Sequence, residues 1–306
     1  MDKLTDLKFG IIGAGSVGTS LAVLLEKAGL ECIGVTTRSR ASYERFRSYL
    51  DKENLPVEQL AALADILFIT TQDKYIEAIA CELSPIQNRK TNQVWIHCSG
   101  SLPAELMCKD HTLKVGYLSL HPLQAFADAD HAVNLMKGTF FGVEGSSQEV
   151  ESLGVALVSL LGGTPIKIDP AKKTFYHSGA VIASNYLVSL VYLAVKLFRR
   201  AGVEQQDAIA ALLPLVTGSL SNIERVGLFQ ALTGPIARGD VQVITKHLDK
   251  LPEAERSVYK GLGRLALELA MEKNATLIRE GDKDTKATEI KTIEENYKQI
   301  EELLRD

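Results

Sequence analysis

Two hydrophobic periodicities divide the chain. From Leu7 to about Ile168, short apolar runs alternate with amphipathic stretches, which is the pattern of parallel strands linked by helices. The expected strands are 9–12, 32–36, 66–70, 94–97, 115–118, 140–143 and 165–168. After Asp169-Pro170 nearly every stretch has helical spacing, and a proline disfavours the helical conformation in the residue before it. The sequence therefore predicts a doubly wound, mainly parallel α/β sheet in residues 1–168 and an all-helical domain in residues 169–306.

Four helices are expected in the second part, at 172–201, 205–226, 241–248 and 253–271, with glycine or proline between them. The charge-rich segment 274–306 repeats apolar residues at spacings of three and four: Ile290, Ile293, Tyr297, Ile300 and Leu303. We expect a solvated helix there, which packs on a partner subunit.

The most apolar helix, near 179–198, predicts a buried helix and no membrane span. It is interrupted by polar and charged residues, namely Ser184, Asn185, Ser189 and Lys196. The helical domain as a whole is expected to form a homodimer.

Composition narrows the class of protein. The net charge of -4 provides no broad positive field for DNA, RNA or an acidic membrane, so no nucleic acid partner is expected. The apolar fraction of 46% and the charged fraction of 24% are those of a folded globular chain. Four cysteines without a CxxC pair, and the start MDKLTDLK without an apolar signal region, predict reduced thiols and a cytoplasmic protein.

A glycine motif follows the first expected strand. In FGIIGAGSVGTSLAVLLEKAG, Gly13, Gly15 and Gly18 have the GxGxxG spacing between an apolar strand and an apolar helix. Gly13 permits the tight turn, Gly15 lets the backbone approach a pyrophosphate, and Gly18 lets the helix pack closely on the strand. The helix that begins at Ser16 and Val17 offers free amides to the anion. This context predicts a Rossmann dinucleotide site.

The end of the second strand predicts the choice of dinucleotide. An NAD site would place Asp or Glu there, but this sequence has Thr37, Arg38, Ser39 and Arg40. Hydroxyl and guanidinium groups suit the 2'-phosphate of NADP, so the sequence predicts NADP rather than NAD. One of the two arginines, more readily Arg40, is equally explained as a surface residue.

The third strand is followed by a second polar group at the expected ligand-binding edge of the sheet. Thr70, Thr71 and Gln72 lie at that carboxyl end and are expected to border the nicotinamide half of the cofactor. The alternative is that they are ordinary polar residues of a loop.

A polar stripe on the first helix after the boundary is the leading candidate for catalysis. At 100° per residue, Lys173, His177 and Ser184 fall on one face, with Asn185 beside them. Histidine can donate a proton near neutral pH, and a neighbouring lysine would lower the pKa of His177. The alternative is a histidine that is buried and hydrogen-bonded between helices.

Three more residues are candidates. His97 and His121 end strands and are expected at the ligand-binding edge of the sheet. Arg238, on a short loop between helices, can hold a carboxylate in a bidentate contact or form a structural ion pair. Asp240 in the same loop is expected to cap the following helix.

Four phrases occur in order: IHCSGSL at 96–102, HPLQAF at 121–126, KTFYHSGAVIASNYL at 173–187 and ALTGPIARGD at 231–240. With the glycine motif, they resemble the Rossmann-like NADP oxidoreductases that carry a DUF2520 domain, and more distantly pyrroline-5-carboxylate reductase and ketopantoate reductase. The resemblance implies an NADP-binding domain and a helical domain that helps to form a cleft and often a dimer. Lys173 is followed by His177 and not by the asparagine of the hydroxyacid dehydrogenases, and a proline-cradling segment is missing, so neither relative's substrate is implied.

The sequence thus favours an NADP-dependent oxidoreductase that acts on a small polar, carboxylate-bearing molecule in the cleft between the domains. A dinucleotide sensor without catalysis is the alternative, and it would need no proton donor. A metal bound by His97, His121 and His177 is a third account. No short HxH or HxxxH spacing supports it, so no metal site is expected.

Overall fold

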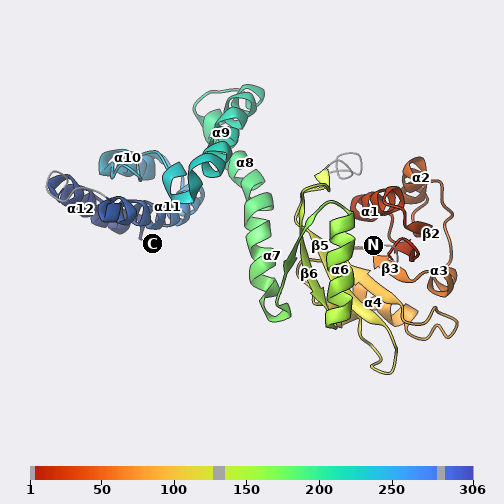
Figure 1. The fold of residues 1–306 in the computed structure, drawn as a ribbon. Helices are drawn as coiled ribbons and strands as arrows, with labels where there is room; N and C mark the ends of the chain where they lie inside the picture. Colours follow the sequence, from red (N-terminus) through yellow and green to blue (C-terminus); the bar gives the residue numbers. More distant parts are fainter. Residues whose placement is uncertain (1–3, 127–134, 281–286, 306) are drawn as a thin grey trace. The chain divides into compact units, whose positions relative to one another are not determined.

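The computed structural model describes residues 4–126, 135–280 and 287–305, with side chains described outside 276–291. Contacts divide the chain into two compact units, Met1–Tyr186 and Leu187–Asp306 (Figure 1). Residues 169–186 therefore belong to the first unit by their contacts, whereas the sequence analysis assigned them to the helical domain. Their side chains explain the difference, because they pack on the sheet.

The first unit is built on one seven-stranded sheet in the order β2-β1-β3-β4-β5-β6-β7. All pairs are parallel except β5 with β6, which confirms the mainly parallel α/β fold. The strands are β1 (Lys8–Ile12), β2 (Glu31–Thr36), β3 (Ile66–Ile69), β4 (Val94–His97), β5 (Gly116–Pro122), β6 (Phe140–Gly145) and β7 (Thr164–Lys167). All seven expected strands are present. β5 runs to Pro122 instead of ending at Leu118, because its second half pairs antiparallel with β6.

Helices cover both faces of this sheet (Figure 1). They are α1 (Ser16–Lys27), α2 (Arg40–Tyr49), α3 (Val57–Leu63), α4 (Asp73–Leu83), α6 (Gln148–Leu160) and α7 (Lys173–Val181), with the short 3-10 helices η1 (Ala104–Met107) and η2 (Pro170–Lys172). Because side chains alternate along a strand, Phe68 and Ile96 enter the core under α1 and α6. Leu67 and Trp95 enter the second core, under α3 and α4.

The second unit contains only helices in the residues described. After the π-helical turn η3 (Ile182–Tyr186) come α8 (Leu187–Arg200), α9 (Gln205–Ala231), α10 (Val241–Lys250), α11 (Glu253–Glu280) and α12 (Ala287–Leu304). The expected helices therefore exist, and α9 and α11 extend further than their patterns indicated. Within α9, Gly227 has a φ of 77° and kinks the helix.

The C-terminal helix α12 has a partner within its own chain. Tyr297, Ile300 and Leu304 are buried against Ile244 of α10 and Leu267 of α11. The expectation of a solvated helix on a partner subunit is therefore wrong for this face, because α10 and α11 already cover it. Among the residues on which that expectation was based, the side chain of Ile290 lies outside the described residues.

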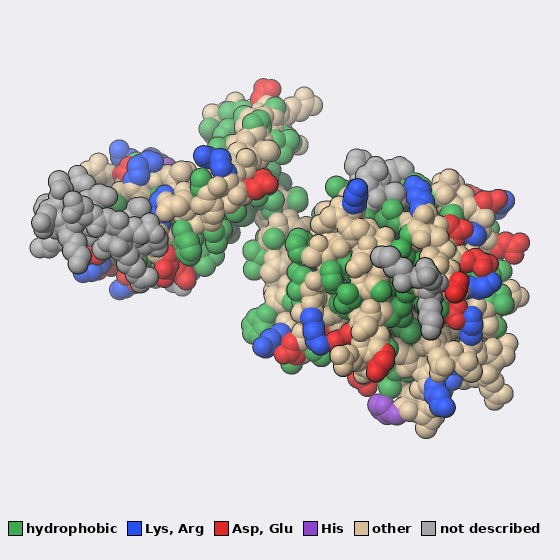
Figure 2. Space-filling view, viewed as in Figure 1, with side chains coloured by type: hydrophobic (Ala, Val, Ile, Leu, Met, Phe, Trp, Pro, Cys, Tyr) green, Lys and Arg blue, Asp and Glu red, His purple; other side chains and the backbone are tan. Residues whose placement is uncertain are grey.

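The most apolar segment is not buried within the chain. Pro170–Arg200 is long and apolar enough to cross a membrane by length and composition, but only 6% of its most apolar window is buried. Phe175, Val188 and Tyr192 are 81%, 71% and 67% exposed. Apolar side chains also gather over α8 and α9 on the face shown in Figure 2. The helix that was expected to be buried is thus mostly exposed in the single chain.

Candidate functional site

The glycine turn after β1 has the geometry that the motif requires. Gly13 has a φ of 108°, and a Cβ atom there would lie 2.9 Å from the Thr71 side chain and 3.0 Å from the Thr70 carbonyl group. At Gly18 a Cβ atom would collide with the Thr70 hydroxyl and the Gly13 carbonyl oxygen. Gly15 caps α1, and its Cβ position meets no atom closer than 4.0 Å. Gly13 and Gly18 are therefore fixed by packing, while Gly15 leaves open space at the start of the helix.

Thr70, directly after β3, braces this turn. Its hydroxyl donates a 2.7 Å hydrogen bond to the Gly13 carbonyl oxygen. The next hydroxyl, that of Thr71, is buried and has no hydrogen-bond partner among the described residues. Gln72 is exposed at the N-terminus of α4. An unpaired buried hydroxyl is costly, so Thr71 is a group that a bound ligand can satisfy.

The end of β2 presents the four residues considered for the 2'-phosphate. The Ser39 hydroxyl caps α2 by accepting from the Ser42 amide, and the Thr37 backbone is held by Asn54. The Arg38 side chain is 84% exposed, with its Nη2 atom 3.4 Å from a Glu82 carboxylate oxygen. Arg40 instead pairs with Glu44 one turn along α2, at 2.8 Å. An exposed ion pair such as that of Arg38 is worth about 0–1 kcal/mol, so a phosphate can replace Glu82 at little cost.

The strand register brings several candidates to one row. Ile12 lies beside Ile69, Ile69 beside His97, and His97 beside Ser119. Gly13 and Thr70 follow the first two strands, so they lie on the same carboxyl edge as the histidine. Three inter-strand steps separate the glycine turn from Ser119, a distance of about 14 Å. The edge is therefore continuous from the turn to the polar residues of β4 and β5.

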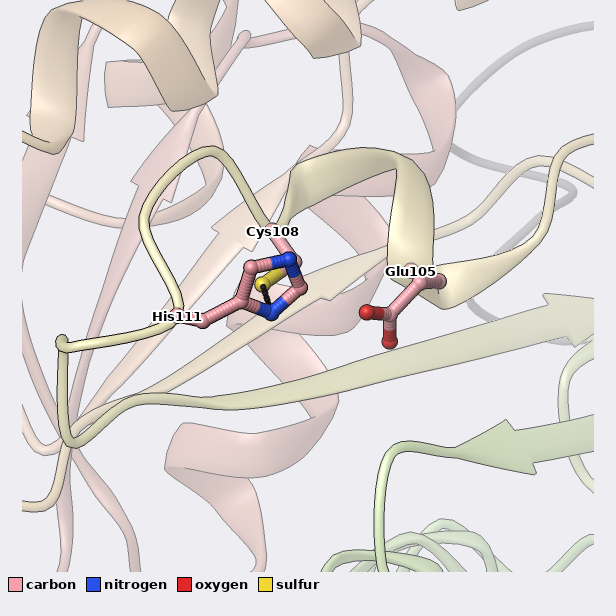
Figure 3. A group of neighbouring side chains, drawn as sticks. All are labelled: Glu105, Cys108 and His111. Atoms are coloured by element: carbon pink, nitrogen blue, oxygen red, sulfur yellow. Dashed lines mark hydrogen bonds between the residues drawn. The ribbon is translucent and has the colours of Figure 1, made fainter.

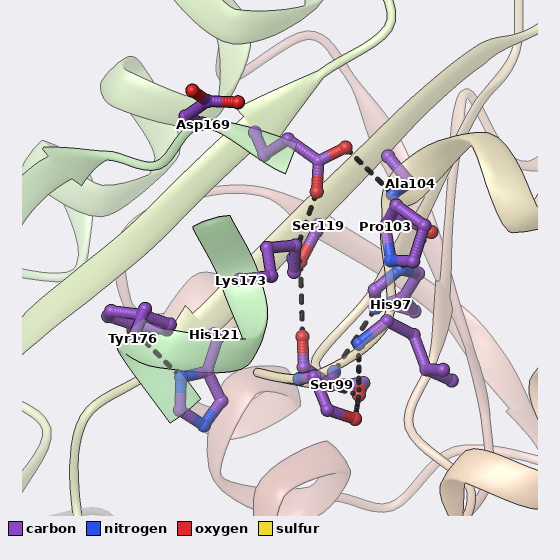
Figure 4. A network of polar contacts seen from close by, with 12 residues as sticks. His97, Ser99, Pro103, Ala104, Ser119, His121, Asp169, Lys173 and Tyr176 are labelled. Carbon is purple, nitrogen blue, oxygen red and sulfur yellow. Dashed lines mark hydrogen bonds and ion pairs between the residues drawn. The ribbon is translucent and has the colours of Figure 1, made fainter. Parts of the chain in front are cut away.

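A buried ion pair lies at the far end of this row (Figure 4). Lys173, the first residue of α7, donates to Glu144 of β6 at 2.9 Å and to the Ser119 hydroxyl at 2.6 Å. Both charged side chains are about 5% exposed or less. Burial lowers the pKa of Lys173, and the Glu144 carboxylate opposes that shift. The second Glu144 oxygen accepts from the Ala104 amide of η1 at 2.9 Å. Lys173 is thus engaged with protein groups, which makes it suited to positioning its neighbours.

His97 is fully buried, with protein partners at both ring nitrogens. Its Nε2 atom lies 3.2 Å from the Pro103 carbonyl oxygen, and its Nδ1 atom accepts from the Ser99 amide at 3.1 Å. Burial first, and the charge of Lys173 second, lower the pKa of His97 to about 4. The structure thus places His97 at the expected edge but leaves neither ring nitrogen for a substrate or a metal.

His121, Tyr176 and His177 form a second cluster. The His121 Nδ1 atom is 2.8 Å from the Tyr176 hydroxyl, and the rings of the two histidines are 5.8 Å apart and nearly perpendicular. Burial first, then the charges of His177 and Lys173, lower the pKa of His121 to about 4, while burial raises that of Tyr176 to about 12. At neutral pH both groups are therefore uncharged, and the hydroxyl and Nδ1 share one hydrogen bond.

Gly100 packs directly on both imidazoles. A Cβ atom there would lie 2.7 Å from His121 Cε1 and 2.7 Å from His177 Nδ1. The latter atom is buried and has no hydrogen-bond partner among the described residues. A neighbouring lysine was expected to lower the pKa of a histidine, and Lys173 contributes to the lowered pKa of His97 and of His121. The loop before Gly100 is tied down as well, since the Ser99 hydroxyl donates to Asp73 at 2.7 Å.

Two predicted residues lie in the π-helical turn, and a third lies in the second unit. Ser184 and Asn185 are in the π-helical turn, so the calculation at 100° per residue, which assumed a continuous α-helix, does not hold across them. Arg238 is exposed on the turn between α9 and α10 in the second unit. Asp240 accepts from the Val243 amide at 3.2 Å, which confirms it as the cap of α10.

The histidines make the stability of the first unit depend on pH. A folded-state pKa of about 4 against an ordinary value of 6.5 means that the unfolded chain binds more protons between these values. Stability from neutral His97 and His121 is complete above about pH 6.5 and is lost as the pH falls toward 4, by up to about 1.4 kcal/mol per pH unit for each histidine. The free energy of unfolding, measured in urea at several pH values across this range, should fall less steeply with falling pH for His121→Gln than for the wild type. The exposed His247→Gln variant is the control, and a dependence on pH that is unchanged in His121→Gln would contradict the prediction.

The comparisons with known proteins agree with this architecture. A Rossmann-like domain matches residues 3–122, and the DUF2520 domain of unknown function matches residues 139–266. No curated protein matches the chain significantly in sequence.

Solved structures share the fold along most of the chain. The provisionally named NADP oxidoreductase BF3122 from Bacteroides fragilis is 25% identical, with a TM-score of 0.69, covering 87% of this chain and 99% of that one. Protein TM1727 from Thermotoga maritima is 23% identical, with a TM-score of 0.68 and the same coverage. Plasmodium falciparum pyrroline carboxylate reductase with NADP bound is 13% identical, with a TM-score of 0.57, and covers 88% of this chain and 98% of its own. The chain therefore combines a Rossmann-like domain with a domain of the DUF2520 family.

Proposed function

We propose that the protein is an NADP-dependent oxidoreductase that transfers a hydride to or from a small polar, carboxylate-bearing substrate. The observation that carries the proposal is the single carboxyl edge of the sheet, which bears the glycine turn at one end and the His121 cluster at the other. The similarity to BF3122, provisionally named an NADP oxidoreductase, supports it.

The residues around the glycine turn fit a dinucleotide. The free amides of Ser16 and Val17 begin α1, where a pyrophosphate is favoured by the helix dipole, and Gly15 leaves space for it. Thr71 lies beside the turn with its hydroxyl unpaired. Arg38 is available for a 2'-phosphate. The bound NADPH would supply the hydride, and the protein residues would supply orientation and a proton.

The proton donor is assigned to His121 and His177. Hydride addition to a carbonyl or imine leaves charge on the heteroatom, which must be protonated. His121 is neutral, and we propose that its Nδ1 atom accepts from the Tyr176 hydroxyl, which leaves its proton on Nε2. His177 is half-buried, with an unpaired nitrogen against Gly100. Lys173 acts as a positioning residue, because it anchors the helix that carries Tyr176 and His177.

The remaining candidates complete the proposal. Ser184, Asn185 and Arg238 are proposed to contact the substrate, with the Arg238 guanidinium holding its carboxylate. A cytoplasmic location and the absence of nucleic acid and membrane partners stay predictions from composition.

A homodimer through the helical domain is also proposed. Along α7 and α8, large apolar side chains such as Phe175, Val188 and Tyr192 are more than 60% exposed. Exposed apolar surface of this extent marks an interface in a soluble protein. A second copy of the chain offers the same apolar face, which is the requirement for a symmetric contact.

Arg38→Ala should weaken NADPH binding about 10–100-fold and leave NADH binding nearly unchanged. The reason is the loss of a charge-assisted bond to the 2'-phosphate, worth about 1.5–3 kcal/mol. Fluorescence titration with both nucleotides measures this, and Arg40→Ala is the matched control. Equal loss for NADPH and NADH, or a wild type that prefers NADH, would remove the assignment.

His177→Ala should lower kcat about 10²–10⁴-fold without changing NADPH affinity, since it removes a proton donor and no nucleotide contact. The substrate is first found by following NADPH oxidation against keto acids, imines and aldehydes. His247→Ala, a histidine of the second unit bonded to Tyr259, is the control. NADPH binding with no turnover of any of these compounds is the result that the sensor hypothesis predicts.

Val188→Lys should convert a dimer into a monomer, because it places a charge on the exposed apolar face of α8. Light scattering after size-exclusion chromatography reports the mass. Gln205→Lys adds the same charge at an exposed polar position and should leave the dimer intact. A monomeric wild type would refute the proposed dimer.

A further inference from the structure

Three side chains with metal-binding atoms converge where η1 ends and the following loop begins (Figure 3). Glu105, Cys108 and His111 each offer one ligand atom, and these atoms all lie within 4.8 Å of one another. The Cys108 sulfur is 3.3 Å from His111 Nδ1. Among the described residues, no other group of three such side chains meets this spacing.

The spacing suits a tetrahedral zinc ion. Bond lengths of about 2.0–2.3 Å to oxygen, nitrogen and sulfur put neighbouring ligand atoms about 3.5 Å apart. The sulfur and imidazole nitrogen already have this separation. Glu105 is exposed, so its carboxylate can close the remaining ångström by a change of side-chain torsion.

The backbone under the three side chains is fixed by other bonds. The Cys108 amide donates to the Glu105 carbonyl oxygen at 2.9 Å. The Asp110 carboxylate accepts from the Thr112 amide at 2.8 Å, and Lys109 pairs with Glu77 of α4. The loop that carries His111 is therefore ordered without an ion.

Tyr117 of β5 supplies an independent observation. Its side chain is 4% exposed, and its hydroxyl is buried without a hydrogen-bond partner among the described residues. A metal-bound cysteine sulfur is a hydrogen-bond acceptor, so an ion held by Cys108 would give this hydroxyl the partner that it lacks. Such outer-shell donors orient the ligands of protein metal sites.

We propose that Glu105, Cys108 and His111 bind one Zn²⁺ ion, with water at the fourth position and the Tyr117 hydroxyl donating to the Cys108 thiolate. Sulfur and imidazole ligands select zinc over Mg²⁺ and Ca²⁺, which prefer oxygen. Binding releases the thiol proton to solvent and changes no oxidation state. The site lies on the connection that returns from the end of β4 to the start of β5, away from the glycine turn. The ion joins η1 to the following loop.

The test uses the full chain without a histidine tag, stripped with EDTA and dialysed against Zn²⁺. Metal analysis is expected to find one zinc per chain in the wild type and in Cys81→Ser, an exposed cysteine outside the site. Cys108→Ser and His111→Ala should lose the ion. Tyr117→Phe should bind about 10–100-fold more weakly.

Substitution with Co²⁺ gives a second measurement. A near-ultraviolet sulfur-to-cobalt charge-transfer band is expected for the wild type and Cys81→Ser and should be absent for Cys108→Ser. Unfolding by urea confirms that each variant is folded. A wild type that binds no zinc, or a folded Cys108→Ser variant that binds it as tightly, would overturn the proposal.

Discussion

The buried pair of Lys173 and Glu144 is the interaction on which the arrangement of the candidate site depends. Removing two such charges from water costs several kcal/mol per ion, and the cost is offset only where every remaining donor and acceptor is satisfied. Ser119 accepts a further bond from Lys173, and the Ala104 amide donates one to Glu144. The pair thereby fixes β5, β6, η1 and the start of α7 against one another at a single point.

The position of Tyr176 and His177 follows from that anchor. Residues three and four positions after Lys173 lie on the same face of an α-helix, so anchoring Lys173 on the sheet turns both side chains toward it. They then meet His121. This residue lies in the second half of β5, which pairs antiparallel with β6 and extends beyond the parallel part of the sheet. Phe175, elsewhere on α7, is left exposed. The ion pair thus positions the candidate cluster of His121, Tyr176 and His177 at the edge of the sheet.

The sequence was sufficient for the parts of this architecture that periodicity and glycine geometry encode. The seven strands and the roles of Gly13 and Gly18 in the turn were predicted, because alternation and the need for a positive φ are local properties. Glu144 was missed, since a single acidic residue in an apolar strand gives no signal and its partner is distant in sequence. The π-helical turn was also unpredictable, and it invalidated the face assigned to Ser184. The Glu-x2-Cys-x2-His spacing stood in the sequence, but Cys108 and His111 lie beyond the end of η1, so no helical period indicated that the three side chains meet.

Both ends of η1 are tied to polar clusters of different kinds. Its first amide holds Glu144, and its last turn leads to Cys108. The loop before it carries Gly100, which touches both His121 and His177 and tolerates no side chain. The Ser99 and Ser101 hydroxyls both donate to Asp73, so the loop is held before and after Gly100. An ion at Cys108 would add a third restraint on the same segment, so the distance between Gly100 and the histidines would be held by bonds that involve neither imidazole.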